Sequence, residues 1–353
     1  MIEIIEATEP IRWKKVVDAF PDPDVYYRLE YLRAFELHGD GSPILLQFSH
    51  NGTTAICAMM MRDIAEDKHF SGIIPHGEYF DLITPYGYGG FIFNHTPDAY
   101  TLNIVKEEFY AALKEMKIVS AFFRFHPMYK NADFHREMVN VIDLGKTIHI
   151  DLETSDLIWN NFTSKNRGKI RKAEKNGVEV KHAKDLKLFT PFMEIYNGTM
   201  QHDNATDYYY FSKEFYESID KDLNDHYEMF YAEHQGKIIA MSIMLFDGQH
   251  MHYHLSGSRF EFRNLEATNI LLYKAALWGN EHGLKSLHLG GGVGSSEDSL
   301  LKFKEGFNRQ SDNQFSIGKL IVDKEKYDEL INLRNEVDLD FNKESKFFPT
   351  YRS

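Results

Sequence analysis

The chain has 353 residues and one cysteine, so it cannot form a disulfide bond within itself. Cys57 lies in the apolar run AICAMMM, where a small buried hydrophobic side chain is the ordinary expectation. No general base is recognisable beside it in the sequence. We therefore assign this cysteine no nucleophilic role.

Long apolar runs are also missing. None approaches the roughly 20 residues that a helix needs to span a bilayer. The first residues, MIEIIEATEP, have neither the basic start nor the apolar core that is typical of a secretion signal. These features predict a cytoplasmic protein without a transmembrane segment.

Positive charge is scarce overall, since 40 Lys and Arg stand against 53 Asp and Glu, a formal net charge of −13. This balance argues against a broad basic surface that wraps nucleic acid, but it allows a local basic patch. The segment SKNRGKIRKAEK is such a patch, and on a helix its cations lie close together. They are Lys165, Arg167, Lys169, Arg171 and Lys172. The patch is either a solvated helix face or a grip for a nucleotide, a pyrophosphate or a tRNA end.

The same order of predicted elements occurs twice. Hairpins are predicted at residues 49–61 and 233–245, each with a glycine at the turn and alternating apolar residues after it. Each hairpin precedes a strand, an amphipathic helix and a second strand. The predicted elements are the strand 83–93, the helix 102–116 and the strand 119–127 in the first half, and 250–258, 265–282 and 284–291 in the second. This recurrence predicts a duplication with two similar domains.

A glycine-lined strand end follows the second of these units. Gly290, Gly291 and Gly292 stand before a predicted helix that carries Lys302 and Lys304. A backbone without side chains can approach a ligand closely, and a helix start can receive an anion or a developing negative charge. The segment therefore predicts a group-transfer site.

Three histidines alternate in the strand 250–258. His250, His252 and His254 would project from one face, as in a zinc site completed by a further ligand. The alternative is that the opposite face is simply buried. We assign no metal, and we interpret His254 and Ser256, nearest the strand end, as lining the acceptor site.

Taken together, these segments resemble the Fem-type peptidoglycan-bridge aminoacyltransferases and their acetyltransferase-like relatives in the GNAT superfamily. In the second half the similarity rests on the basic segment, on MQHDNATDYYYFSKEFY, on HYHLSGS, and on LGGG followed by DSLLKFKEGF. In the first half it rests on the hairpin, YGYGGF and FRFHP. The motifs occur in the order of the family.

The resemblance implies an α+β fold made of tandem duplicated GNAT-like domains, each a mixed twisted sheet flanked by helices. We place the N-terminal domain at residues 1–150 and the C-terminal domain, with the transfer site, at 151–353. The implied activity moves an amino acid from aminoacyl-tRNA, or an acyl group from coenzyme A, onto an amine. In the cell-wall branch of the family this amine belongs to a peptidoglycan-type cell-envelope precursor. No tightly bound cofactor and no metal are implied.

The lysine of the family's Phe-Lys motif maps to Lys304. Attack of an amine on an ester or thioester develops negative charge on the carbonyl oxygen, which a fixed cation can stabilise. Lys304 is therefore the predicted catalytic residue. The alternative is a surface lysine on an amphipathic helix.

Further contacts are predicted on the same grounds. The predicted substrate-binding residues are Tyr86, Tyr88, Gly89, Arg124, Tyr209, His254, Ser256, Gly290, Gly291 and Gly292. The predicted phosphate or tRNA contacts are Lys165, Arg167, Arg171, Lys172, Arg259 and Arg263. We nominate no general base, although Asp298 is one candidate.

The donor and the acceptor remain open at this level. The loop GSRFEFRNLEATN lacks the Gly-x-Gly pattern of ordinary coenzyme A sites, which favours aminoacyl-tRNA. The long coiled-coil arm of classical wall-bridge enzymes has no counterpart in the heptad pattern here. The alternatives are a coenzyme A-dependent N-acetyltransferase that acts on an amino sugar or polysaccharide precursor, and a non-catalytic binding module with the same fold.

Overall fold

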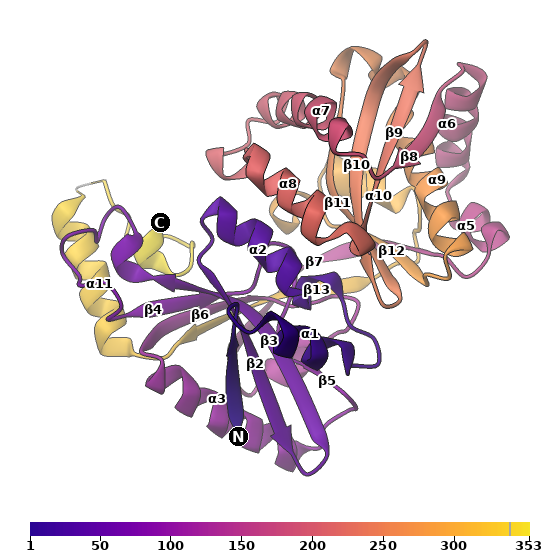
Figure 1. Cartoon of the computed structure of the whole chain (residues 1–353). Coiled ribbons are helices and arrows are strands. Elements are labelled where there is room, and N and C mark those ends of the chain that lie inside the picture. Colours follow the sequence, from indigo (N-terminus) through magenta and orange to yellow (C-terminus); the bar gives the residue numbers. More distant parts are fainter. Residues whose placement is uncertain (339) are drawn as a thin grey trace. The chain divides into compact units, whose positions relative to one another are not determined.

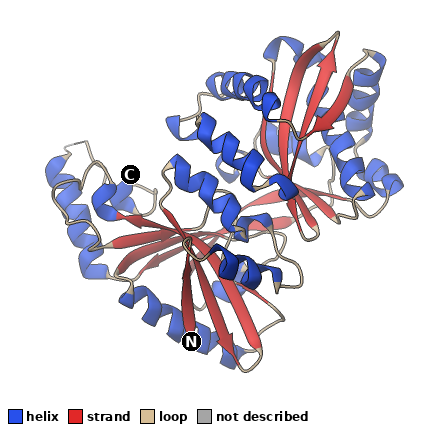
Figure 2. Ribbon diagram, in the orientation of Figure 1, coloured by secondary structure: helices blue, strands red, loops and turns tan. Residues whose placement is uncertain are grey.

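The computed structural model describes residues 1–338 and 340–353, and the chain divides into two compact units. Unit 1 comprises residues 1–21, 26–144 and 315–353, and unit 2 comprises 22–25 and 145–314. Figures 1 and 2 show a sheet with flanking helices in each unit. No helix within the described residues is long and apolar enough to cross a membrane.

The sheet of unit 1 is mixed. Its strand order is β1 (Ile2–Glu6), β2 (Ser42–His50), β3 (Thr53–Asp63), β4 (Phe80–Ile83), β6 (Ile118–Arg124) and β13 (Asn313–Ile321), and the short β5 (Ile92–Phe93) pairs with β3. The β4–β6 pair is parallel, whereas the neighbouring pairs are antiparallel. The predicted strand 83–93 is wrong as one element, because Gly87 and Gly90 turn the chain at positive φ between β4 and β5.

The helices of unit 1 cover both faces of this sheet. They are α1 (Pro10–Asp18), α2 (Leu29–His38), α3 (Ala99–Glu115), α4 (Ala132–His135) and α11 (Lys324–Val337). Helix α3 begins at the cap Asp98, whose carboxylate accepts from Thr101 N at 2.8 Å, and it buries Val105, Phe109 and Leu113 at helical spacing. Cys57 lies in the same core cluster as Val105, Phe109 and Leu113 of α3, and burial raises the pKa of its thiol.

The sheet of unit 2 has a matching order. Its strands run β8 (Glu179–Ala183), β9 (Tyr227–His234), β10 (Lys237–Asp247), β11 (His250–Ser258), β12 (Ser286–Gly290) and β7 (Asn140–Asp151). Here too a parallel pair, β11–β12, lies between antiparallel neighbours. Its helices are α5 (Ser155–Asn161), α6 (Ser164–Lys175), α7 (Phe189–His202), α8 (Lys213–Asp222), α9 (Ala267–Glu281) and α10 (Ser299–Glu305).

The two units repeat one topology. Each has an edge strand, then a hairpin, then a strand–helix–strand crossover, and finally an antiparallel strand on the far side. The last strand of each sheet comes from the other half of the sequence order. Strand β7 follows β6 in the chain but pairs with β12, and β13 follows β12 in the chain but pairs with β6. The predicted fold, a mixed sheet with flanking helices in tandem, is confirmed.

Candidate functional site

The triple glycine forms a tight turn at the end of β12. Gly290 has a φ of +75°, which favours glycine. A Cβ on Gly291 would lie 2.9 Å from Lys146 O, and one on Gly292 would lie 2.1 Å from Ser296 O. The packing of the chain on itself therefore requires these glycines, and their contact with a substrate stays a prediction.

Asp298 connects this turn to α10. One carboxylate oxygen accepts from Leu301 N at 2.8 Å and caps the helix, and the other accepts from Val293 N at 2.9 Å. A single-turn 3-10 helix, Val293–Ser295, therefore separates the glycines from α10, which does not follow them directly. The backbone donors, Leu301 first and Val293 next, lower the pKa of Asp298. A carboxylate held in this way is a weak proton acceptor and a poor candidate for a general base.

Lys304 is buried on α10, with 7% of its surface exposed, so the alternative of a surface lysine is wrong. Its Nζ donates to Gly291 O at 2.7 Å, the only acceptor recorded for it within residues 1–338 and 340–353. Burial lowers the pKa of Lys304 to about 8, and the nearby Asp298 partly opposes this effect. The ammonium therefore stays mostly charged at neutral pH and keeps N–H donors for a ligand.

Two parallel strands separate beside this turn. The pairing of β11 with β12 covers only His250–His252 against Ser286–His288, although β11 continues to Ser258. Beyond these three residue pairs, β11 and β12 form no further backbone pairing with each other in the part of the chain that the structure describes. An extended ligand can hydrogen-bond to an unpaired strand edge.

A β-bulge corrects the predicted row of histidines. Ile243 pairs with Leu255 and Met244 with Tyr253, so His254 is the extra residue on β11 and does not continue the alternation of His250 and His252. Burial lowers the pKa of His254 to about 3, and the neighbouring His252 adds to the effect.

The first two histidines of the row bond to neighbouring side chains. His252 Nε2 lies 2.8 Å from Asp24, and His250 Nδ1 lies 2.7 Å from Ser286 Oγ. Ser256 Oγ accepts from Tyr253 OH at 2.5 Å. The roles of His254 and Ser256 toward an acceptor stay predictions.

The basic segment forms the helix α6, as predicted. Arg167 donates to the backbone carbonyls of Trp159, Asn160 and Phe162 at the end of α5. Arg171 lies over the Trp159 ring, 5.3 Å from its centroid. These two arginines therefore stabilise the end of α5, and the exposed Arg171 is the more accessible to an anion.

The lysines of α6 lie near the start of α9. Lys169 Nζ and Lys172 Nζ lie 2.9 and 3.5 Å from the Glu266 carboxylate, at the residue before α9 begins. A carboxylate at a helix start is favoured by the helix dipole. Lys165 is exposed.

The two arginines of the loop after β11 differ in environment. Arg259 Nη2 lies 2.8 Å from the Glu194 carboxylate, whereas Arg263 stacks on the exposed Phe260 ring at 4.0 Å. Tyr209, on the 3-10 helix Asp207–Tyr209, is half-buried. Phosphate binding by the two arginines and substrate binding by Tyr209 stay predictions.

The predicted residues of unit 1 lie together at the end of β6. Gly89 N donates to Arg124 O at 2.8 Å, and the Gly89 Cα faces the Thr84 side chain so closely that a Cβ would lie 2.8 Å from it. Tyr86 stacks on Phe35, and Tyr88 packs edge-on against Tyr26. Their binding of substrate stays a prediction.

Sequence reasoning missed a polar network behind α10. His149 Nε2 lies 3.2 Å from Asp151 Oδ1, and His149 Nδ1 lies 2.9 Å from Ser311 Oγ. The order resembles a nucleophile triad. However, Ser311 is 3% exposed, and its hydroxyl donates to Thr147 O. The network therefore fastens the segment after α10 to β7. No sequence spacing links residues so far apart.

A second missed feature joins α6 to α9. Asn269 Nδ2 donates to Asn166 Oδ1 at 2.7 Å, and both residues are almost fully buried. Thr163, the cap of α6, donates from its backbone N to Gly306 O at 2.9 Å. The starts of α6 and α9 and the end of α10 are thus held together.

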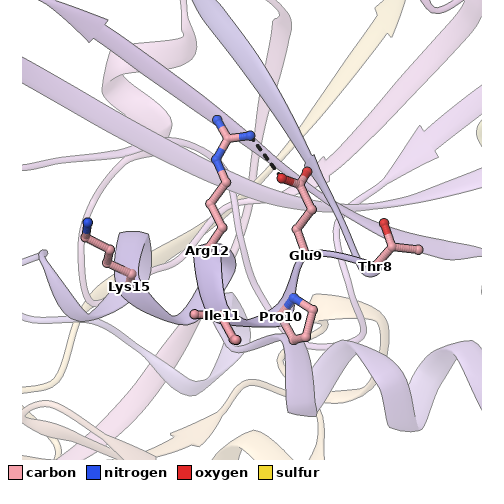
Figure 3. Close-up of a pocket in the computed structure, with 6 residues that line it drawn as sticks. All are labelled: Thr8, Glu9, Pro10, Ile11, Arg12 and Lys15. Carbon is pink, nitrogen blue, oxygen red and sulfur yellow. Dashed lines mark hydrogen bonds and ion pairs between the residues drawn. The ribbon is translucent and has the colours of Figure 1, made fainter.

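A further hollow lies on unit 1, at the start of α1 (Figure 3). It is open to solvent and has a volume of about 480 Å³. Its lining residues are Thr8, Glu9, Pro10, Ile11, Arg12 and Lys15. Arg12 pairs with Glu9 at 3.2 Å, and the lining includes no predicted site residue. We assign this hollow no function.

A family model matches part of the chain. Residues 160–302 match the family model of the acetyltransferase (GNAT) domain. This stretch contains α6, the crossover β11–α9–β12, the glycine turn and the start of α10. This part of the chain is therefore similar to a GNAT acetyltransferase domain, as the sequence motifs indicated. A domain of this type implies an acyl-CoA donor.

Solved structures share the fold over nearly the whole chain. FemX superposes with a TM-score of 0.66 at 14% identity, covering 93% of this chain and 99% of FemX. The C-terminal domain of a proposed lysylphosphatidylglycerol synthetase from Agrobacterium fabrum gives 0.53 at 13% identity, covering 88% and 92%. A conserved protein of unknown function from Bacteroides thetaiotaomicron gives 0.57 at 11% identity, covering 91% and 100%. At these identities the similarity shows that the fold is shared. No curated protein matches the chain.

Proposed function

We propose that the protein joins an amino acid or another acyl group to an amine of a peptidoglycan-type cell-envelope precursor, with Lys304 as the catalytic cation. The observation that carries the proposal is the buried Lys304 ammonium, fixed by Gly291 O at 2.7 Å beside the splayed strands β11 and β12. The Fem-type motifs and the fold shared with FemX support the choice of acceptor.

The proposed step is a direct transfer. The free amine attacks the carbonyl carbon of an ester or thioester, a C–N bond forms, and the negative charge moves to the carbonyl oxygen. Lys304 stabilises this oxyanion, which collapses as the ribose alkoxide of tRNA or the thiolate of coenzyme A leaves. The amine loses its proton to solvent. No covalent enzyme intermediate is required.

A coenzyme A-dependent N-acetyltransferase acting on an amino sugar or polysaccharide precursor is the second candidate, because the GNAT domain implies an acyl-CoA donor. A thermal-shift titration with acetyl-CoA separates the two donors. A ligand at about 100 times its Kd stabilises a protein by roughly 2.7 kcal/mol. A saturable shift favours the acetyltransferase, and a flat response leaves charged tRNA as the donor.

The role of Lys304 is tested by Lys304→Ala. Loss of one oxyanion donor typically lowers turnover about 100-fold to 1000-fold. The matched control is Lys302→Ala, since Lys302 is an exposed lysine on the same helix. Equal turnover of the two variants contradicts the assigned role.

A further inference from the structure

Asn166 lies in the first turn of α6, against the end of the helix that carries Lys304. Its backbone N donates to Thr163 Oγ1 at 3.2 Å, and Thr163 N donates to Gly306 O at 2.9 Å. A Cβ built on Gly306 would lie 3.6 Å from the Asn166 Cβ. Gly306 is two residues after Lys304, so Asn166 belongs to the neighbourhood of the proposed catalytic helix.

The orientation of the Asn166 side chain is fixed. Its Oδ1 accepts from Asn269 Nδ2 at 2.7 Å, and Asn269 lies in the first turn of α9, the helix that follows β11. Asn166 and Asn269 are 3% and 5% exposed. Rotation of the amide would break this hydrogen bond in a buried setting, where such a loss is costly.

The other half of the amide has no partner. The Nδ2 of Asn166 is buried and makes no hydrogen bond to any residue that the structure describes. Buried donors in native proteins are nearly always satisfied, so each exception needs an explanation. A donor of this kind that is held rigidly beside a candidate site is suited to a partner that arrives with the substrate.

We infer that the Asn166 side-chain amide donates a hydrogen bond to a carbonyl oxygen of the bound acyl donor. An N–H₂ group donates hydrogen bonds and does not accept them, so its partner on the substrate must be an acceptor. Both donor types, aminoacyl ester and acyl thioester, carry carbonyl oxygens. This inference rests on the proposed function and adds a second substrate contact to Lys304.

Asn166→Asp is the decisive variant, because its carboxylate still accepts from Asn269 while the donor is lost. Asn166→Ala is the second variant, in case the buried carboxylate impairs folding. The matched control is Asn280→Ala on α9, since the Asn280 amide is already satisfied by Leu152 O at 2.6 Å and Glu153 O at 3.1 Å.

The measurement is the Kd of acetyl-CoA and of aminoacyl-tRNA, together with the KM of the donor. Loss of one buried hydrogen bond weakens binding by about tenfold. We expect this loss in both Asn166 variants and not in Asn280→Ala. Unchanged donor binding in a folded Asn166 variant overturns the inference, while the proposed function stands if wild type transfers. If wild type binds neither donor, both fail.

Discussion

Replacement of Lys304 by methionine should stabilise the fold at neutral pH while activity is lost. The ordinary lysine pKa of 10.5 falls to about 8 on burial. Each pKa unit corresponds to about 1.36 kcal/mol, so the buried charge costs the folded state roughly 3 kcal/mol at pH 7. Methionine keeps the packing volume but gives up the hydrogen bond to Gly291 O, which is worth about 1 kcal/mol. The expected net gain is about 2 kcal/mol.

The gain should depend on pH in a definite direction. Because the pKa of Lys304 is lower in the folded state, the unfolded state binds more protons between about pH 8 and pH 10.5. Stability of the wild type therefore rises with pH across this window. The advantage of Lys304→Met is complete below about pH 8 and disappears by about pH 10.5.

Urea unfolding at pH 7 and pH 10 measures this difference. Lys302→Met is the control, because this lysine is exposed on the same helix and its removal should leave stability nearly unchanged at both pH values. The reasoning would be refuted if Lys304→Met were less stable than wild type at pH 7. It would also be refuted if the variant exceeded wild type by the same unfolding free energy at both pH values.

Further predictions concern packing and buried charge. Gly168→Ala should stabilise α6 by up to about 1 kcal/mol in thermal unfolding, since nothing lies within 4 Å of its added Cβ; a lower melting temperature would contradict this. Gly291→Ala should destabilise by about 1–3 kcal/mol, because its Cβ would lie 2.9 Å from Lys146 O; an unchanged midpoint would show that the turn relaxes freely. His135 is buried, and burial lowers its pKa to about 4, so the protein should lose roughly 3 kcal/mol of unfolding free energy as the pH falls from 6.5 to 4. In urea unfolding, His135→Gln should flatten this decline. An equally steep decline in the variant would contradict the prediction.

The sequence by itself determined the local elements. Alternation and turn glycines located both hairpins, β2–β3 and β9–β10, and helical spacing of apolar residues located α3 and α9. These signals are local, because each depends on residues within one or two turns of each other. The order of the elements then indicated the duplication, and the motif order indicated the GNAT-type domain.

Only the tertiary structure decided the environment of the chemistry-bearing side chains. The sequence allows Lys304 to be either buried or exposed, and only the tertiary structure shows that it is buried and bonded to Gly291 O. The bulge at His254 is set by the register with β10, and the Asn166–Asn269 bond joins residues 103 positions apart. Burial and hydrogen bonding are properties of neighbours in space, and neighbours of this separation leave no periodic trace in the chain.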